Sequence, residues 1–531
     1  MSSTTATHRR ASADTRSLRL AERWFALGVA GCTVAVAIFF LVSLRTWPPH
    51  EDETLALFVG RDSLGGLLHT VHGERGGAPL HFLVAWVVVH LGGGLTALRL
   101  ASVLFAVASV PVLALLSARL AGRRIGLVAT VLASASWLVL FHGVFGRMYS
   151  LFLLTSALSF LALLRAVERD RPGRWALWAL ATLATIAAHP YGALVLAAQA
   201  VFVLARARTR NALVAGAAVV VAAAPFWYSD RVLAGRLDVG VGDGGSRLEG
   251  PLGVLGYLAD AAGDASSGFA PVLVVVLVLA VLGWWRLPRT AAILTACVVG
   301  VPAVALALAR LGHSASPESR HLVFALPFFS TAVATGLFAA LRRPAALVAA
   351  VALLVSAEVA WAWHRTPALF EGEPAARVEA RSDASAWLAA TAHRDDVLFG
   401  YDPLFIGAWE RERDFPATVV PRADAKLAVD ALQSAGSLGR GVWVLDAGDN
   451  NNRPPRATVA LRLPAPQGAF EGRVFGPYLV LRTREATRTP ARYLALAASA
   501  MTLGKELGVV DDDGNLHTIE LAQARLRQPR E

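Results

Sequence analysis

Charged residues and cysteines are both scarce in this sequence. Lys, Arg, Asp and Glu together make up 17% of its 531 residues, whereas hydrophobic residues make up 55% and the mean hydropathy is +0.51. Soluble globular domains carry more charge than this, so the composition indicates a membrane protein with many spans. The two cysteines, Cys32 and Cys297, lie inside apolar runs and imply no disulfide framework.

The sequence also lacks the marks of a nucleic-acid-binding protein and of a cleaved signal peptide. Its net charge of +11 comes with arginines in short clusters between apolar runs, which is typical of cytoplasmic loops, so we expect no nucleic-acid partner. The first apolar run, Trp24 to Leu44, has 21 residues without a charge and no small-residue cleavage site after it, which predicts a retained span. Residues 1–23, rich in Ser, Thr and Arg, are expected to form a disordered cytoplasmic tail.

Apolar runs long enough to cross a bilayer recur through residues 24–364. The stretch Trp175–Ala205 is broken at His189-Pro190-Tyr191-Gly192, where Pro and Gly favour a turn, and is interpreted as two short spans with a recessed turn. Pro79–Leu91 has only 13 residues and is interrupted by His81 and His90, which favours an interfacial or re-entrant helix. The remaining predicted spans are Thr96–Ala118, Ile125–Phe145, Met148–Leu164, Ala212–Tyr228, Phe269–Trp285, Thr290–Leu311, His321–Leu341 and Pro344–Trp363.

The arginine clusters decide whether the short segment crosses the membrane. If residues 79–91 lie in the interface, the chain has eleven spans, a cytoplasmic N-terminus and an extracytoplasmic C-terminus, and every cluster faces the cytoplasm. A crossing there would turn all the later clusters outward, against the positive-inside rule. We therefore predict eleven spans in the plasma (inner) membrane. The clusters are Arg119/Arg123/Arg124, Arg165/Arg169/Arg171/Arg174, Arg206/Arg208/Arg210, Arg286/Arg289 and Arg342/Arg343.

From about Arg365 the chain becomes polar and mixed in pattern. Short β-type runs and helical patterns alternate there, which predicts a small extracytoplasmic α/β domain over residues 365–531. The fold class is thus an α-helical polytopic membrane protein with a small α/β C-terminal domain. The β-type runs are Val397–Gly400, Val442–Leu445 and Val474–Leu481, and the helical patterns are Asp383–Ala392 and Lys426–Ser434.

Three carboxylates follow the first span, in the first outer loop at residues 45–78. Glu51, Asp52 and Glu53 stand beside the membrane surface, where carboxylates are costly and usually serve chemistry or ion binding. Partial burial would raise the pKa of Asp52 or Glu53 toward the range of a general base. Three adjacent carboxylates also leave room for a divalent metal. The simpler alternative is an acidic loop solvated by water.

Other polar residues fall at the same predicted face. Arg147 lies where one span turns into the next, with Tyr149 close by, and a guanidinium there would suit a phosphate; the alternative is an arginine that reaches lipid headgroups. The recessed turn contributes His189 and Tyr191, although a lone histidine at a helix end is more often structural.

A further polar group precedes the span that begins at His321. Arg320 could be a second phosphate ligand and Glu318 its partner or a substrate contact, with His321 next to them; the alternative is an ordinary outer turn. Each signal is weak by itself. Their convergence on one membrane face is the arrangement expected for handling an anionic lipid phosphate and a neutral sugar.

These motifs, in this order, resemble the GT-C superfamily of polyprenyl-phosphate-dependent glycosyltransferases, in the branch of protein O-mannosyltransferases and aminoarabinose transferases. The resemblance covers about residues 20–365. It is carried by Asp52-Glu53, Ala78-Pro79-Leu80, Ala97-Leu98-Arg99-Leu100-Ala101-Ser102, Arg147-Met148-Tyr149, His189-Pro190-Tyr191-Gly192 and Ser319-Arg320-His321-Leu322 leading to Pro327. Many relatives have two prolines or Lys-Pro where this chain has Gly77-Ala78-Pro79.

The resemblance implies an integral-membrane inverting glycosyltransferase. Asp52 would be the general base with Glu53 beside it, and Arg147 and Arg320 would bind the phosphate of a polyprenyl-phosphate sugar. The sugar, hexosyl or pentosyl, would pass to a glycan, lipid or protein acceptor at the outer face.

A polytopic transporter or lipid flippase of envelope glycan precursors is the alternative. Transporters usually show internal repeats and polar residues near the bilayer midplane. No internal repeat is evident here, and the predicted spans are nearly free of charge apart from Arg99 and Glu358. The pattern therefore favours an enzyme at the membrane surface.

Overall fold

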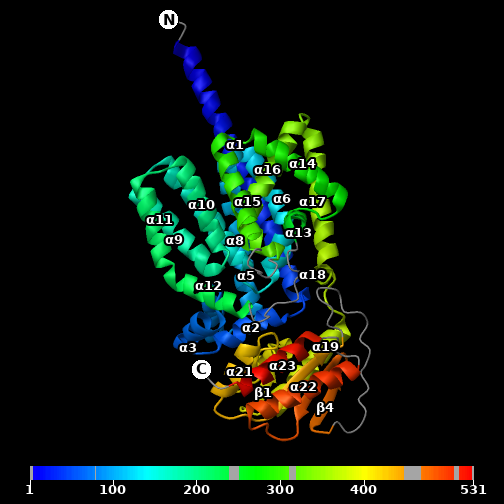
Figure 1. Cartoon of the computed structure of the whole chain (residues 1–531). Helices are drawn as coiled ribbons and strands as arrows, with labels where there is room; N and C mark the ends of the chain where they lie inside the picture. The colour runs from blue at the N-terminus through cyan, green and yellow to red at the C-terminus, as the bar shows by residue number, and fades with distance from the viewer. Residues whose placement is uncertain are drawn as a thin grey trace.

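The computed structural model describes residues 4–77, 79–237, 250–309, 318–447, 468–507 and 513–528. Helices dominate the chain and form a bundle, with an α/β domain at the end opposite to the N-terminus (Figure 1). Ala78 of the Ala78-Pro79-Leu80 motif lies outside the described residues, as do residues 238–249 and 310–317.

The bundle contains fifteen described helical elements. They are α1 (Thr4–Thr46), α5 (Leu95–Ala121), α6 (Arg123–Ala135), α7 (Trp137–Val144), α8 (Tyr149–Glu168), α9 (Pro172–Ala188), α10 (Gly192–Arg206), α11 (Arg210–Ala222), α12 (Ala224–Leu237), α13 (Gly250–Asp264), α14 (Ala270–Arg286), α15 (Arg289–Ala309), the 3₁₀ helix η3 (Ser319–Ala325), α16 (Leu326–Ala340) and α17 (Pro344–Arg365).

Among the described residues, five helices are long and apolar enough to cross a membrane, or up to seven spans if each of two bent pairs counts as one. The bent pairs are α6 with α7, at 58°, and α11 with the first part of α12, at 50°. Four shorter apolar helices add to these, including α10, α14 and the helix at Pro79–His90. The chain is therefore a multi-pass membrane protein, and the count of eleven stays a prediction.

The breaks in these helices have local causes. Ser136 has extended backbone angles and separates α6 from α7, and Pro225 at the start of α12 cannot continue the hydrogen-bond ladder of α11. The predicted break at His189-Pro190 is confirmed, because α9 ends at Ala188 and α10 begins at Gly192. By contrast, α1 begins at Thr4, inside the expected disordered tail; no Pro or Gly interrupts the chain before Gly28.

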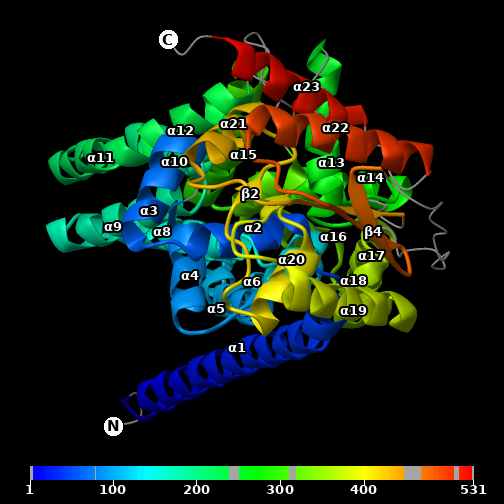
Figure 2. The ribbon, with the colours of Figure 1, turned by 90° about the horizontal axis from the view of Figure 1, so that it is seen from below.

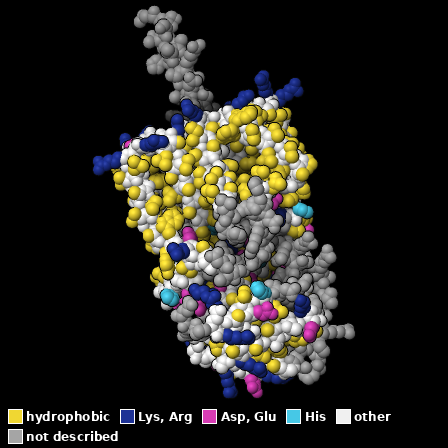
Figure 3. Space-filling model, in the orientation of Figure 1, with side chains coloured by type: hydrophobic (Ala, Val, Ile, Leu, Met, Phe, Trp, Pro, Cys, Tyr) yellow, Lys and Arg dark blue, Asp and Glu magenta, His cyan; other side chains and the backbone are white. Residues whose placement is uncertain are grey.

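The surface of the bundle is apolar, as a lipid-facing protein requires. Figure 3 shows hydrophobic side chains over the bundle, Lys and Arg at the end from which α1 emerges, and mixed charges on the α/β domain. Large exposed apolar side chains on its helices include Leu104, Leu180, Val221 and Val278. The bundle therefore presents a belt suited to hydrocarbon.

The predicted first outer loop and the short apolar helix after it form the first outer segment, which connects α1 to α5. It comprises α2 (Glu51–Gly60), α3 (Leu64–His69), the π-helix η1 (Thr70–Arg75) and α4 (Pro79–His90). The last of these corresponds to the predicted interfacial helix. In the view from below, α2 lies near the centre behind α20, and α4 lies at one side next to α5 (Figure 2).

The C-terminal domain is built on a five-stranded sheet of order β2-β1-β3-β5-β4. The first three strands of this order pair in parallel, and β5 pairs antiparallel with β3 and β4. The elements are α18 (Ala368–Glu371), α19 (Ala375–Thr391), β1 (Val397–Phe399), α20 (Pro403–Arg411), β2 (Val419–Val420), α21 (Ala425–Ser434), β3 (Gly441–Asp446), β4 (Phe470–Phe475), β5 (Tyr478–Thr483), α22 (Pro490–Glu506) and α23 (Asp513–Arg527).

One apolar core joins this domain to the first outer segment. Leu57 of α2 and Phe82 of α4 belong to the same buried cluster as Leu398, Phe405 and Val480 of the domain. The other face of the sheet packs against α21, α22 and α23 in a separate cluster. Because burial of apolar surface drives this packing, the domain and the first outer segment form one structural unit.

Candidate active site

The start of α2 orients the three carboxylates differently. His50 caps the helix: its Nδ1 accepts a hydrogen bond from Asp52 N at 3.1 Å, and its own N–H donates to Glu53 Oε2 at 3.1 Å. This reciprocal cap fixes the first turn. Successive side chains on a helix point about 100° apart, so Glu51, Asp52 and Glu53 reach three different environments.

Glu53 is fully buried in a bidentate ion pair with Arg99 of α5. Arg99 Nε lies 2.8 Å from Glu53 Oε1, and its Nη2 lies 2.6 Å from Oε2. Gly146 N also donates to Oε1 at 2.8 Å. Arg99 further binds the carbonyl oxygens of Trp47 and Pro48, each at 2.8 Å. This network locks the end of the first span, α2 and the turn before Arg147 together.

Glu51 faces the C-terminal domain. Its Oε1 accepts a hydrogen bond from Tyr401 N at 3.0 Å, and its Oε2 lies 3.9 Å from Arg422 Nη1. Thr54, one turn further along α2, donates from its hydroxyl to the carbonyl oxygen of Tyr401. Residues of α2 therefore bind both the backbone N–H and the carbonyl oxygen of Tyr401. These two hydrogen bonds attach the C-terminal domain to this helix.

Asp52 faces a group of cations and is half-buried. Burial of its carboxyl raises the pKa, but the charges of Arg147, His50, Arg320 and Arg75 together outweigh burial and hold the pKa below the usual range of aspartic acid. The expectation of a raised pKa is therefore wrong for this group. The physical reason is the number of cations, which the local sequence around Asp52 does not reveal.

Arg147 follows α7 at the turn into α8. Its Nη1 donates to the carbonyl oxygen of Asp52 at 3.1 Å, and its buried Nε has no hydrogen-bond partner among the described residues. A buried donor without a partner is costly unless a ligand completes it. Arg147 Nε is therefore available to donate a hydrogen bond to a ligand beside the Asp52 carboxylate.

Arg320 of η3 lies on the other side of the same group. Its guanidinium carbon is 5.1 Å from the centre of the buried Tyr149 ring, and it forms an ion pair with the exposed Glu318. His321 Nδ1 accepts a hydrogen bond from Glu318 N at 3.2 Å, which fixes the imidazole at the start of η3. Tyr257 donates from its hydroxyl to the Glu318 carbonyl oxygen at 3.1 Å.

Aromatic rings connect Arg320 to the turn between α9 and α10. The ring of His321 lies 5.2 Å from that of His189, 4.9 Å from that of Tyr191 and 6.1 Å from that of Tyr149. His189 Nδ1 accepts a hydrogen bond from Tyr191 N at 3.0 Å, and its ring stacks on Phe152 at 4.7 Å. His189 therefore also stabilises the turn.

The structure thus brings the nine expected site residues to one end of the bundle. Arg147 and Arg320 both act electrostatically on Asp52, and an aromatic wall lies next to them, formed by Tyr149, His189, Tyr191 and His321. Glu53 and Glu318 lie at its edges, each paired with an arginine.

Four polar residues of this region were not among the nine site residues predicted from the sequence. Arg99 carried a signal, since it is a charge inside an apolar run. His81 interrupts the short apolar helix α4; it is buried, its Nε2 has no partner among the described residues, and Arg147 and Asp52 act on it. His142 is buried against Tyr149, with ring centroids 4.5 Å apart, and gave no such signal. Arg75 acts on Asp52 from η1.

The three carboxylates do not converge on one point where a metal could bind. Glu53 is held by Arg99 and Glu51 by Tyr401 N, so only Asp52 faces the cationic group. In the part of the chain that the structure describes, no group of three or more His, Cys, Asp or Glu side chains could hold a metal ion. The residues present do not fit the divalent metal considered above.

Comparison with known proteins gives one sequence match and several structural ones. Residues 76–228 match the family described as Dolichyl-phosphate-mannose-protein mannosyltransferase. No curated protein matches the chain. The fold is similar to that of ArnT from Cupriavidus metallidurans bound to undecaprenyl phosphate, with a TM-score of 0.52 and 14% identity over 86% of this chain and 98% of that one. The apo ArnT gives 0.50 and 16% identity over 87% and 98%.

Proposed function

This chain has the fold of the GT-C glycosyltransferases, and from that premise we propose that it transfers a sugar from a polyprenyl-phosphate donor to an acceptor hydroxyl at the outer face of the membrane. The observation that carries the proposal is the position of Asp52. Its carboxylate faces Arg147 and Arg320 at the end of a lipid-facing bundle. A carboxylate beside two arginines provides a proton acceptor and a phosphate-binding group in one place.

In this proposal Asp52 is the general base. The acceptor oxygen attacks the anomeric carbon from the side opposite to the phosphate, and the Asp52 carboxylate takes the proton of the acceptor hydroxyl. The bond between the anomeric carbon and the phosphate oxygen breaks, and its electron pair leaves with the polyprenyl phosphate. The sugar is therefore transferred with inversion.

Arg147 and Arg320 stabilise the leaving phosphate. Arg147 has a buried Nε without a partner among the described residues, and the guanidinium of Arg320 is held over Tyr149. Fixed cations that face developing negative charge lower the barrier without any rearrangement during the reaction. No separate acid is then needed, because the phosphate leaves as an anion.

Donor binding also adjusts the base. In the free protein, the arginines hold the pKa of Asp52 below its usual range despite burial. A donor phosphate that pairs with Arg147 and Arg320 offsets their charges at Asp52, so its pKa rises toward the value at which a general base is most effective. Asp52 thereby becomes more basic when the donor is in place.

Glu53 has a positioning role in this mechanism. Its carboxylate accepts hydrogen bonds from Arg99 and from Gly146 N, and Gly146 directly precedes Arg147. The pair therefore fixes the distance between the helix that carries Asp52 and the turn that carries Arg147. Positioning of this kind is needed because small displacements of reacting groups slow catalysis strongly.

The orientation of the molecule follows the positive-inside rule. Lys and Arg gather at the end of the bundle from which α1 emerges, and the candidate site and the C-terminal domain lie at the other end (Figures 1 and 3). Since positive charges favour the cytoplasmic side, we infer that the site and the domain face outward. A polyprenyl chain would then lie along the apolar helices with its phosphate at the site.

Acceptor-dependent release of polyprenyl phosphate tests the proposal. The purified full chain is incubated in lipid nanodiscs with undecaprenyl-phosphate mannose or undecaprenyl-phosphate arabinose, with and without extracts of envelope glycans. Release that needs both the protein and the acceptor, and mass spectrometry that finds the sugar on the glycan, are expected. In sealed proteoliposomes, movement of intact donor across the bilayer without cleavage would instead identify a flippase.

A further inference from the structure

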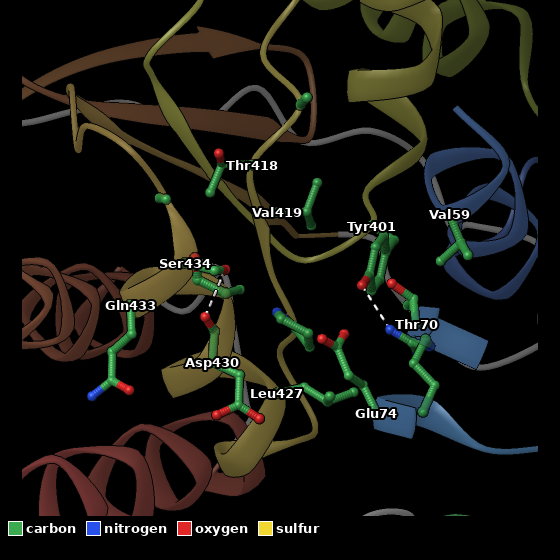
Figure 4. A pocket seen from close by; sticks show the side chains of 15 residues that line it. Val59, Thr70, Glu74, Tyr401, Thr418, Val419, Leu427, Asp430, Gln433 and Ser434 are labelled. Atoms are coloured by element: carbon green, nitrogen blue, oxygen red, sulfur yellow. Dashed lines mark hydrogen bonds between the residues drawn. The ribbon is translucent and has the colours of Figure 1, made fainter. Parts of the chain in front are cut away.

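A cavity of about 590 Å³ opens between the first outer segment and the C-terminal domain. Figure 4 shows that η1 contributes one wall, with Thr70 and Glu74, and that α21 contributes another, with Asp430 and Ser434. Tyr401 lies beside Thr70 of η1, and its hydroxyl accepts a hydrogen bond from Arg75 Nη1 at 2.8 Å. The volume lies within the range of sites for small ligands.

The lining has the chemistry of a carbohydrate site. The lining includes four residues that carry hydroxyl groups, Thr70, Tyr401, Thr418 and Ser434, together with apolar residues such as Val419. Hydroxyl-rich ligands need both kinds of contact, since their edges hydrogen-bond and their ring faces pack on apolar or aromatic groups. An acyl chain would instead need a largely apolar groove.

The charges of the lining favour a neutral ligand. Glu74 and Asp430 are carboxylates, and Arg75 is the one cation among the described lining residues, already bonded to Tyr401. A polyanionic ligand would meet these two carboxylates and lose affinity through like-charge repulsion. The cavity therefore discriminates against acidic glycans.

The cavity lies close to the proposed base. Val59, on its wall, belongs to the same helix as Asp52 and is seven residues further along, about 10 Å at the usual helical rise. Arg75 lines the cavity and is also one of the cations that lower the pKa of Asp52. A chain of a few sugars held here could place its terminal hydroxyl at Asp52.

We propose that this cavity binds the acceptor and that the acceptor is a neutral oligosaccharide chain. The inference rests on the proposed glycosyl transfer, to which it adds the class of acceptor. It also gives a function to the C-terminal domain, whose docking through Tyr401 forms one side of the cavity.

Direct binding tests the cavity independently of transfer. The intact protein in nanodiscs is mixed with mannotriose, maltotriose or arabinotriose, and binding is followed by saturation-transfer NMR and calorimetry. Trigalacturonate serves as the anionic probe and a Ser/Thr-rich peptide as the protein-like probe. At least one neutral trisaccharide is expected to bind more tightly than either of these two probes.

A matched pair of variants locates the binding. Ser434→Trp fills the cavity, whereas Ser437→Trp makes the same change at an exposed position outside it. Ser434→Trp should raise the dissociation constant of the neutral trisaccharide by about tenfold or more, a loss of about 1.4 kcal/mol. Ser437→Trp should leave it unchanged, and neither variant should alter binding of undecaprenyl phosphate.

Several results would overturn the proposal. These are no binding by any of the three neutral trisaccharides, equal or tighter binding of trigalacturonate or the peptide, or the same dissociation constant in both tryptophan variants. If transfer occurs but Ser434→Trp keeps the acceptor KM of the wild type, the cavity is not the acceptor site and the proposed transfer stands. If trisaccharide binds at the cavity but no donor is cleaved, the cavity is a saccharide-binding site, and both the proposed transfer and the acceptor role of the cavity fail.

Discussion

At the scale of single residues, the three adjacent carboxylates Glu51, Asp52 and Glu53 have three different partners and therefore three different roles. Glu53 is paired with Arg99, and Glu51 accepts a hydrogen bond from the backbone N–H of Tyr401. Of the three, only Asp52 faces the cations of the candidate site. The division follows from helical geometry, because neighbouring side chains leave the helix in different directions. At this scale the proposal depends on the protonation state and the position of Asp52.

The pH dependence of catalysis should report the cations around Asp52. The pKa of this group is lowered in the free protein, so it stays ionised until the pH falls below its usual range. We expect the acid limb of kcat/KM below about pH 4, the ordinary value for aspartate, because kcat/KM reports the free enzyme. The acid limb of kcat should lie at higher pH, since the bound donor offsets the arginines.

Variants of Arg147 test whether its positive charge sets the position of the acid limb of kcat/KM. Arg147→Ala removes the largest lowering charge, so the acid limb of kcat/KM should move to higher pH, whereas Arg147→Lys should keep it near the wild-type position. Initial rates between about pH 3 and 8, measured over a range of donor concentrations at saturating acceptor, supply both profiles. An acid limb that does not move in Arg147→Ala would contradict this electrostatic account.

Removal of Glu53 should destabilise the molecule strongly. Glu53→Ala leaves the Arg99 guanidinium buried and unpaired, and loss of one partner of a buried pair typically costs about 3–5 kcal/mol. We expect a clearly lower unfolding temperature in detergent, followed by tryptophan fluorescence. Glu379→Ala, at an exposed position of α19, is the control and should change it little. Equal unfolding temperatures would show that the pair does not stabilise the site.

At the scale of elements, breaks and caps bring distant parts of the chain together. The turn after α7 carries Arg147, the turn after α9 carries His189, and η3 carries Arg320. The first two of these turns each follow an apolar helix, whereas η3 leads into the apolar helix α16. The result is a site whose residues come from segments far apart in the sequence, as is common where loops lie on a rigid scaffold.

The seating of the C-terminal domain on α2 can be tested at Glu51. Glu51→Ala removes the acceptor of Tyr401 N and the ionic partner of Arg422, so the contact of the domain with α2 should weaken. Limited proteolysis should then cleave between α17 and α19 faster than in the wild type, and the transfer rate should fall while undecaprenyl phosphate still binds. Unchanged proteolysis and unchanged transfer together would show that this contact is dispensable. Glu379→Ala again serves as the control.

Much of the element order was predictable, and the exceptions have physical reasons. The β-type runs at Val397–Gly400 and Val442–Leu445 are confirmed as β1 and β3. The run Val474–Leu481 is not one strand but the end of β4 and the start of β5, because Gly476, with φ +54°, and Pro477 turn the chain. Strand β2 has two residues and too little pattern to be predicted.

The sequence allowed the residues of the candidate site to be predicted, but not the contacts among them. The nine residues were chosen because they lie at span ends, and the structure brings them to one end of the bundle. Their pairing was not predictable, because the contacts of Glu53 with Arg99 and of Glu51 with Tyr401 join residues 46 and 350 positions apart in the sequence. The lowered pKa of Asp52 depends on the same kind of long-range contact.

On the scale of the whole molecule, the arrangement in the membrane decides which side the site faces. The arginine clusters and the short helix α4 predict that the first outer segment and the C-terminal domain lie outside the cytoplasm. Both parts share one apolar core, so they must lie on the same side. Their common orientation can be measured directly.

Labelling of single cysteines on intact cells tests this topology. In a background of Cys32→Ser and Cys297→Ser, cysteines are placed at the exposed positions Ser63, Leu91, Arg124 and Ser437 and treated with an impermeant thiol reagent. Ser63, Leu91 and Ser437 variants should label, whereas the Arg124 variant should label only after the cells are opened. Labelling of Arg124→Cys on intact cells would place α4 across the membrane or reverse the orientation.

The turnover of Asp52→Asn tests the central proposal most directly. The amide has the shape of the carboxylate but cannot take the proton of the acceptor hydroxyl. With purified protein in nanodiscs, saturating donor and acceptor, kcat should fall by about 10²–10⁴-fold, the usual contribution of a general base, while undecaprenyl phosphate still binds and the unfolding temperature stays near that of the wild type. Turnover of Asp52→Asn at the wild-type rate would show that Asp52 is not the base.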